Sequence, residues 1–355
     1  MKASGLRRGF FAALLAVAAL ALAACGDDEE SSGSGGSSGG GDGGGERLKI
    51  GEVFYSTDPY QVALEKWMKR YADEEGFDFT ACNQDLKPEP GIDCVRNWVT
   101  QDFDGIIYAP VDPAAAVAPT KQAQQAGIPV IGVATKPGPG VELPFADAME
   151  KEQTLEAGKN AAEQAQELSP GEPVSALVLD LPNLPICAER RMGGFIEGVK
   201  SVAPDANIIT VDGKGDRAGA RAVAADAIQS GQDFNIVTAC TGEMIQGALS
   251  ALKAAGRGKA TDKKPESEYV FAIDGDRLQV EQLLDPTSPV MQVMGLTPRE
   301  NARKAIDLIM RAIDEEIAID AAEVVPLPAQ LLEPDCDAAN EYLQEEYFDE
   351  PVDCP

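Results

Sequence analysis

The sequence predicts an α/β protein with two doubly wound lobes, each built on a parallel sheet. From residue 48 onward, short apolar runs typical of strands alternate with amphipathic stretches typical of helices. The same alternation starts again in the second half of the chain. About 310 residues remain once the first, compositionally unusual segment is set aside, and chains of that length commonly form two domains. Strands that alternate with helices favour parallel sheets covered on both faces.

The first half carries four of the predicted strands. After the first strand, Asp58 suits the N-cap of a helix, Pro59 its first position and Gly76 its end. Trp67 and Trp98 lie on the faces of predicted helices, and we expect both in the core. The predicted strands are 48–55, 77–82, 105–109 and 128–134, and the helices begin at residue 59, include 94–99 and cover 113–126.

The second half repeats this order. Its predicted strands are 174–181, 208–211, 234–239 and 270–273, with helices at 188–202, 216–229 and 243–255. In sheets of this kind, ligands bind beyond the carboxyl ends of the strands. We therefore look for function in the loops that follow the strands.

The N-terminus is typical of an exported protein. Arg7 and Arg8 precede an apolar run at 10–22, which is too short for a membrane span. The sequence Leu22-Ala-Ala-Cys25 resembles the lipobox of bacterial lipoproteins, which implies a signal peptide at 1–24 and a lipid on Cys25. An ordinary secretion signal with a chance cysteine is the alternative. The expected location is the cell envelope, outside the cytoplasm, with membrane attachment only through Cys25.

The segment 25–46 is almost wholly Gly and Ser after a short acidic start. Such a composition cannot bury enough apolar surface to fold, so it predicts a disordered tether. A merely tolerated low-complexity insert is the alternative. Either interpretation places the folded body after residue 46.

Charge and composition exclude several classes of function. The chain has 59 acidic and 30 basic residues, a net charge of −29, and no histidine. The negative charge argues against binding nucleic acid or an anionic membrane surface. The absence of histidine excludes histidine-dependent nucleophiles and histidine metal sites. We predict no enzyme activity, no cofactor and no metal, with a carboxylate-based hydrolase using a pair such as Asp147 and Asp274 as the disfavoured alternative.

The cysteines predict disulfides. Besides Cys25 the chain has six, an even number that favours three disulfides in an exported protein. Six cysteines allow fifteen pairings. Local spacing suggests Cys82–Cys94 and Cys336–Cys354, which leaves Cys187–Cys240 by elimination. A thiolate metal cluster is the weaker alternative, because no CxxC spacing occurs.

Five motifs, in a fixed order, resemble those of ribose- and galactose-type solute-binding proteins of ABC importers. The resemblance covers about residues 48–317. The motifs are Ile107-Tyr-Ala-Pro-Val-Asp112, Gln125-Ala-Gly-Ile-Pro-Val130, Arg190-Arg-Met-Gly-Gly-Phe-Ile-Glu-Gly198, Thr241-Gly-Glu-Met-Ile-Gln-Gly-Ala-Leu249 and Phe271-Ala-Ile-Asp-Gly275. By these motifs the chain is identified as a member of the type I periplasmic binding proteins.

The resemblance implies two lobes joined by a three-strand hinge, with crossings near Ala146-Asp147, Gly295-Leu296 and Ala322. The N-terminal lobe would be 47–146 plus 297–322, and the C-terminal lobe 147–296 plus 323–333. A tail at 334–355 would be pinned by its disulfide. Lobe closure would trap a small solute, and an ABC permease with its ATPase would recognise the closed, monomeric protein. A sensor that docks on a signalling receptor is the alternative.

The candidate ligand contacts lie at strand ends and in the loops after them. Carboxylates and amides pair with sugar hydroxyls, and aromatic rings cover the apolar face of a sugar ring. Several candidates also have purely structural alternatives: Asp58 as a helix cap, Asp147 as a hinge residue, Asp274 as part of a turn. The candidates are Tyr55, Asp58, Tyr60, Asp112, Lys136, Asp147, Glu189, Arg190, Thr241 and Asp274.

The chain departs from the family pattern at two places. After the fourth strand, Ala134-Thr135-Lys136 stands where an Asp-Arg pair is common, and Gly295-Leu296 lacks the usual amide side chain. A buried hydroxyl without a partner costs about 1–3 kcal/mol, so lost partners indicate a different ligand from ribose. We expect a sugar or sugar-like ligand, with a less polar or cationic small molecule as the alternative.

Overall fold

The computed structural model describes residues 46–354, and these form one unit. The expected signal peptide at 1–24, Cys25 and all but the last residue of the expected tether lie outside the described residues. Within residues 46–354, no helix combines the length and the apolar character needed to cross a membrane.

Two six-stranded sheets confirm the predicted α/β class with two parallel-sheet lobes. The first sheet has the order β13-β5-β4-β3-β1-β2, and every pair in it is parallel. Its strands are β1 (Lys49–Phe54), β2 (Asp78–Asn83), β3 (Gly105–Tyr108), β4 (Val130–Val133), β5 (Phe145–Ala148) and β13 (Val324–Leu327).

The second sheet has the order β14-β12-β11-β8-β6-β7. It is parallel except at its edge, where β14 runs antiparallel to β12. Its strands are β6 (Ser175–Asp180), β7 (Asn207–Asp212), β8 (Ile236–Ala239), β11 (Tyr269–Asp274), β12 (Val290–Leu296) and β14 (Ala329–Leu332), and a short hairpin of β9 (Ala260–Thr261) and β10 (Lys264–Pro265) lies apart from it.

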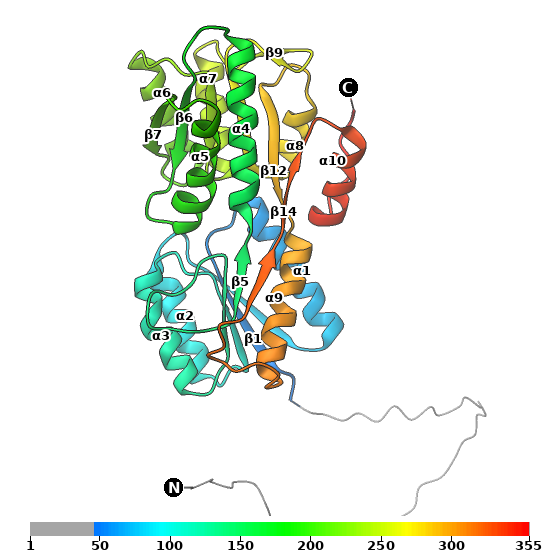
Figure 1. Cartoon of the computed structure of the whole chain (residues 1–355). Coiled ribbons are helices and arrows are strands. Elements are labelled where there is room, and N and C mark those ends of the chain that lie inside the picture. The colour runs from blue at the N-terminus through cyan, green and yellow to red at the C-terminus, as the bar shows by residue number, and fades with distance from the viewer. Residues whose placement is uncertain (1–45, 355) are drawn as a thin grey trace, which may run out of the picture. The chain divides into compact units, whose positions relative to one another are not determined.

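Helices cover both faces of the first sheet. Ile309 of α9 packs against Gly105 on one face, and Trp98 of α2 packs against Gly51 on the other. Both tryptophans that we expected in the core are buried. Figure 1 shows α9 beside α1 in this lobe. The helices here are α1 (Pro59–Glu75), α2 (Pro88–Thr100), α3 (Pro113–Gln125) and α9 (Pro298–Ile313).

The helices of the second lobe pack in pairs, α4 with α5 and α6 with α7. A side chain on Gly158 of α4 or on Gly198 of α5 would overlap the backbone of the facing helix, so these two helices approach closely. The helices are α4 (Glu150–Leu168), the π-helix η1 (Ile186–Arg191), α5 (Met192–Val202), α6 (Arg217–Gln229), α7 (Gly242–Ala254) and α8 (Arg277–Leu284).

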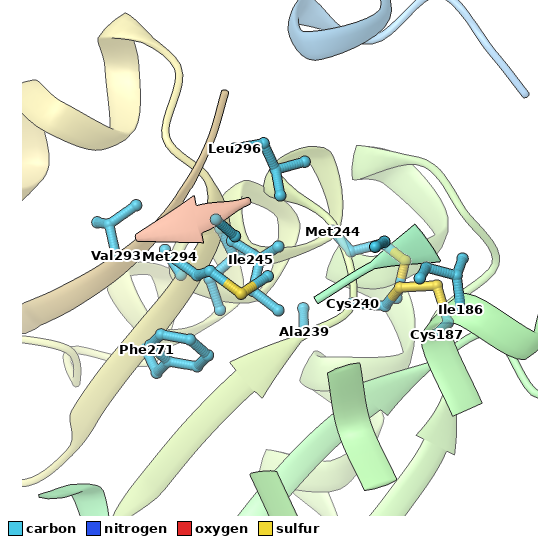
Figure 2. Packing of buried hydrophobic residues seen from close by; sticks show 14 of the residues in the cluster. Ile186, Cys187, Ala239, Cys240, Met244, Ile245, Phe271, Val293, Met294 and Leu296 are labelled. Atoms are coloured by element: carbon cyan, nitrogen blue, oxygen red, sulfur yellow. A yellow bond between two sulfur atoms is a disulfide. The ribbon is translucent and has the colours of Figure 1, made fainter. Parts of the chain in front are cut away.

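A disulfide lies inside the core of the second lobe. Figure 2 shows Cys187 and Cys240 joined next to Ile186 and Met244, and Phe271 belongs to the same cluster. The other two expected pairs, Cys82–Cys94 and Cys336–Cys354, are also present. All three pairings suggested by spacing and elimination therefore occur in the structure.

Three segments cross between the lobes. The first crossing lies at Met149, between β5 and α4, and the second at Thr297, between β12 and α9. The third lies at Pro328, between β13 and β14, rather than near Ala322. Residues 324–327 thus pair with β5 in the first sheet, whereas the expected boundaries place them in the second lobe. Pairing with β5 covers backbone groups that would otherwise form an open sheet edge.

The tail after the third crossing is helical. It forms α10 (Cys336–Tyr342) and a π-helical turn, η2 (Leu343–Tyr347). In Figure 1, α10 lies beside the second lobe, close to α8 and β14. Sequence periodicity did not reveal these elements, nor α4 and α8.

Candidate functional site

A cleft of about 790 Å³ separates the two sheets, and both lobes contribute to its walls. Its lining comes largely from the carboxyl ends of strands in both sheets, among them β1, β4, β5, β6, β8 and β11, where ligands of doubly wound sheets bind. The volume lies within the range of about 300–1,000 Å³ that is usual for small-molecule sites. The cleft is therefore the candidate site.

The wall from the first lobe is aromatic and held by neutral hydrogen bonds. The Tyr55 hydroxyl donates to Thr135 Oγ1 at 2.7 Å, and Asn301 Nδ2 of α9 donates to the Tyr60 hydroxyl at 3.0 Å. Burial raises the pKa of both tyrosines above the ordinary value, so both stay neutral. Because their hydroxyls are anchored, the two rings have fixed positions in the cleft wall.

Asp58 is both a helix cap and a cleft residue. Its Oδ1 accepts from the backbone N–H of Gln61 at 3.0 Å, and its Oδ2 accepts from Ser56 Oγ at 2.5 Å. Asp58 therefore caps α1, and its half-buried side chain also lines the cleft. The two interpretations offered by the sequence do not exclude each other.

The wall from the second lobe is a buried ionic cluster. Arg191 is 8% exposed and donates to both carboxylate oxygens of Glu150, at 2.5 and 3.1 Å. It also donates to the Cys240 carbonyl at 2.9 Å and faces Asp274 Oδ1 at 3.5 Å. A guanidinium that forms a bidentate ion pair with a carboxylate has a strongly fixed orientation. The Cys187–Cys240 disulfide ties the helix that carries Arg191 to the end of β8.

Asp274, the last residue of β11, is the second carboxylate of this cluster. Its side chain is 5% exposed, and its Oδ2 accepts from the backbone N–H of Gly242 at 2.7 Å. Burial raises the pKa of Asp274 above the ordinary aspartate value; the positive charge of Arg191 opposes this, and Asp58 adds to it. Asp58 and Asp274 thus bring like charge toward the cleft from opposite lobes. A ligand that donates hydrogen bonds to both would relieve that repulsion.

Glu52 is a further buried carboxyl in the cleft wall. It lies on β1, and within residues 46–354 its carboxyl takes part in no hydrogen bond or ion pair. Burial, together with the nearby carboxylate of Glu65, raises the pKa of Glu52 to about 8. At neutral pH the group is therefore mostly a neutral acid, which can both donate and accept a hydrogen bond.

The cleft brings together five of the ten predicted ligand residues. Thr241 is one of them; its hydroxyl oxygen caps α7 by accepting from the backbone N–H of Met244 at 3.3 Å. As an acceptor in that bond, the hydroxyl keeps its own hydrogen for a ligand. The residues that line the cleft are Tyr55, Asp58, Tyr60, Thr241 and Asp274.

The other five do not line the cleft. Asp112 caps α3 through the N–H groups of residues 114 and 115, and Lys136 lies over the ring of Phe145. Asp147 forms an ion pair of 2.7 Å with Arg190, and Glu189 is exposed on η1.

Arg191, rather than Arg190, enters the cleft because of the local helix geometry. Residues Ile186–Arg191 form a π-helix, which continues into the α-helix α5. A π-helical turn holds more residues than an α-helical turn, so it shifts the face on which each following side chain lies. A sequence motif that is compared on the assumption of a regular α-helix cannot detect this shift from Arg190 to Arg191.

Among the cleft residues that were not predicted, four lie in the walls described above: Glu52, Glu150, Arg191 and Asn301. Glu52 interrupts an otherwise apolar strand, and this was a usable signal. Glu150 begins α4 and Asn301 lies within α9, both next to hinge crossings, where the sequence pattern carries no mark of the cleft. Among residues 46–354, no group of acidic and cysteine side chains is arranged to hold a metal ion.

Comparison with known proteins places this architecture in a family. The family model described as a periplasmic binding protein domain matches residues 53–317. The chain belongs to this periplasmic binding protein family. The match confirms the family that the five motifs predicted, and its members bind solutes rather than catalyse reactions. No curated protein sequence matched this periplasmic binding protein.

Solved structures share the fold at low sequence identity. One is an ABC transporter periplasmic solute binding protein from Actinobacillus succinogenes 130z with bound D-allose, with a TM-score of 0.69 and 17% identity over 83% of this chain and 100% of that one. A Mycobacterium smegmatis protein in complex with β-D-fucofuranose has a TM-score of 0.72 and 22% identity over 85% and 95% of the two chains. The Caulobacter myo-inositol binding protein has a TM-score of 0.68 and 18% identity over 81% and 94%.

Proposed function

We propose that this periplasmic binding protein is the solute-binding component of an ABC importer and captures a sugar or a sugar-like polyol between its lobes. The observation that carries the proposal is the cleft, in which both lobes present polar groups, and the first lobe also presents aromatic rings, at the carboxyl ends of their strands. Structures with this fold hold D-allose, β-D-fucofuranose and myo-inositol. All three ligands are small rings rich in hydroxyl groups.

The ligand contacts we propose come from both walls. Tyr55 and Tyr60 offer rings against the C–H face of a sugar, and Asp58, Thr241 and Asp274 offer hydrogen-bonding groups. Arg191 and Glu52 add a fixed donor and a neutral acid. These side chains are already oriented by protein hydrogen bonds or by burial, and such preorganisation lowers the entropic cost of binding.

We further propose that ligand binding favours approach of the lobes about the three crossings. The first and third crossings are joined by a hydrogen bond from Met149 N–H to the Leu327 carbonyl at 3.0 Å. The second and third are joined by Thr297 Oγ1, which donates to the Pro328 carbonyl at 2.9 Å. Hinge closure driven by contacts that exist only in the closed form is a population shift, and the closed form would be delivered to the permease and its ATPase.

The remaining parts of the proposal concern attachment and assembly. We propose that Cys25 carries a lipid, that 25–46 tethers the body at the outer side of the membrane, and that the protein acts as a monomer. Incorporation of labelled fatty acid into the full chain, but not into Cys25→Ser, tests the anchor. Light scattering after size exclusion tests the monomer.

The ligand class is tested by calorimetric titration of the protein against D-allose, D-galactose, L-arabinose, D-fucose and myo-inositol, with aliphatic and aromatic amines as a second panel. The expected result is binding of at least one polyol with one site per chain, and its loss in Tyr60→Ala. Mass spectrometry of material released by denaturation identifies any cargo that co-purifies. Binding confined to the amine panel would overturn the proposal.

A further inference from the structure

The C-terminal segment 334–354 is folded onto itself. The Cys336–Cys354 disulfide joins the start of α10 to the end of the segment. The Asn340 side chain donates to the Val352 carbonyl at 3.1 Å and accepts from the Val352 N–H at 2.7 Å. The fold-back gives the segment a fixed shape, which allows it to act as a rigid part rather than as a loose end.

The segment contacts both lobes. In the first lobe, Trp67 of α1 donates through Nε1 to the Glu346 carbonyl at 2.7 Å and stacks on Phe348 with ring centroids 4.0 Å apart. The Glu346 carboxylate accepts from the backbone N–H of Arg299, in the first turn of α9, at 2.8 Å. A carboxylate at that end of a helix is favourably placed.

On the second lobe, Arg277 of α8 donates to the Glu350 carbonyl. Tyr342 lies against the backbone of β11 and β12, where a side chain on Gly275 or Gly295 would overlap its ring. The Tyr342 hydroxyl lies 2.7 Å from the Leu296 carbonyl, directly before the second hinge crossing. The segment therefore spans the lobes beside the hinge and does not line the cleft.

Two tyrosine hydroxyls of the segment meet at one carbonyl, that of Asp274. The Tyr347 hydroxyl donates to it at 2.6 Å, and the Tyr342 hydroxyl lies at 3.1 Å from it. The same peptide is held at its other end, where the Gly275 N–H donates to Gln279 Oε1 at 2.6 Å. The peptide that follows the cleft carboxylate is thus fixed on both sides.

Asp274 needs this support, because its backbone has φ +98°, in the left-handed region that disfavours residues with a side chain. Such a conformation costs about 1–3 kcal/mol and persists only where the surroundings impose it. Without the hydroxyls, the peptide between residues 274 and 275 can rotate toward a relaxed conformation. The Asp274 carboxylate would then leave its place against Gly242 and Arg191.

We propose that the segment 334–354 is a clasp that fixes the Asp274 carboxylate in the cleft from behind, with Tyr342 and Tyr347 as positioning residues. Its role in ligand binding rests on the proposed function, since it concerns the same cleft. The clasp itself is a property of the folded chain and can be measured without any ligand.

The test uses the double variant Tyr342→Phe/Tyr347→Phe, which removes both hydroxyls and keeps both rings. The matched control is Tyr269→Phe on the same strand β11, because the Tyr269 hydroxyl makes no hydrogen bond within residues 46–354. Hydrogen exchange of the Gly242 amide reports directly on the Asp274 carboxylate that it binds. We expect exchange at Gly242 to be at least tenfold faster in the double variant and unchanged in the control.

A second readout is the pH at which the Asp274 carboxyl titrates, followed by carbon NMR. The charged groups that face this carboxyl are Arg191 from η1, Asp58 from the loop before α1 and Asp276 at the N-cap of α8. If the clasp holds the carboxyl in its buried place, the double variant lets it reach water and lowers its pKa toward the ordinary aspartate value. The control keeps the elevated pKa.

Unchanged exchange at Gly242 and an unchanged titration in a folded double variant would overturn the proposal. If the double variant does not fold, the single variant Tyr347→Phe, which removes the shorter of the two bonds, gives the same two readouts. Neither measurement needs a sugar. A protein that binds none of the tested polyols but shows both effects would reject the proposed function and keep the clasp.

Discussion

The two lobes build their walls of the cleft by different physical means. The first lobe fixes Tyr55 and Tyr60 through neutral hydrogen bonds to Thr135 and Asn301. The second lobe fixes Arg191 through charges that are buried. A neutral bond contributes about 1 kcal/mol, whereas removing one partner of a buried ion pair costs about 3–5 kcal/mol. Folding and site geometry are therefore more closely linked in the second lobe than in the first.

The largest effect is expected from Arg191→Met, which leaves Glu150 and Asp274 buried without their cation. We expect a loss of about 3–5 kcal/mol in the free energy of unfolding, measured by urea denaturation. The matched control is the neighbouring Arg190→Met, which breaks a more exposed pair with Asp147 and should cost about 1 kcal/mol. Equal losses of unfolding free energy in the two variants would contradict the distinction between the buried cluster around Arg191 and the more exposed Arg190–Asp147 pair.

The next effect concerns the disulfides of the two lobes. Cys187→Ala/Cys240→Ala opens a loop of 53 residues and Cys82→Ala/Cys94→Ala a loop of 12. Loop entropy predicts losses of about 4 and about 3 kcal/mol in the free energy of unfolding. The first pair also ties Arg191 to the end of β8. Of the two double variants, we therefore expect only Cys187→Ala/Cys240→Ala to change the exchange rate of the Gly242 amide, which lies at the cleft.

Glu52 introduces a pH dependence into the first lobe. Its pKa is raised to about 8 in the folded protein because of burial, so the folded state binds this proton more tightly than the unfolded state. Its contribution to stability is complete at low pH and is lost as pH rises from the ordinary glutamate value to about 8. The slope reaches at most about 1.4 kcal/mol per pH unit. Thermal melts from pH 4 to pH 9 should show that slope, and Glu52→Gln should reduce it.

Exposed Glu89→Gln is the control for this experiment, since it removes one carboxylate from the same lobe without touching the cleft. A pH profile that stays the same in Glu52→Gln and in Glu89→Gln would show that Glu52 does not keep its proton in the folded state.

The smallest effect is expected from Tyr60→Phe, which removes only the acceptor for Asn301. It should cost about 1 kcal/mol in the free energy of unfolding and leave the ring in place for a ligand. Calorimetry with a polyol that binds the wild type should show little change for Tyr60→Phe and a large loss for Tyr60→Ala. Similar affinities for the two variants would remove the ring from the proposed site.

Sequence signals predicted the structure reliably where it depends on interactions between residues that are close together in the chain, as at the start of a helix. Asp58, Thr241 and Asp276 cap their helices through side-chain oxygens. The sequence predicted this cap for Asp58, whereas Thr241 was singled out only as a candidate ligand residue in the loop after a strand. Asp58 and Thr241 also line the cleft, since their cap positions lie at the carboxyl ends of strands. Glu150 and Asn301 have no such local mark, and their place in the cleft follows from the hinge crossings.

The amino-acid sequence by itself determined the α/β class, the two lobes, the family and the set of paired cysteines, because periodicity, ordered motifs and cysteine spacing are written along the chain. Tertiary structure alone decided that Arg191 enters the cleft and that the third crossing lies at Pro328. It also decided that Tyr342 and Tyr347 reach Asp274 across some 70 residues. These outcomes depend on helix phase, on which sheet edge is open and on contacts between distant segments, and none of them leaves a local pattern.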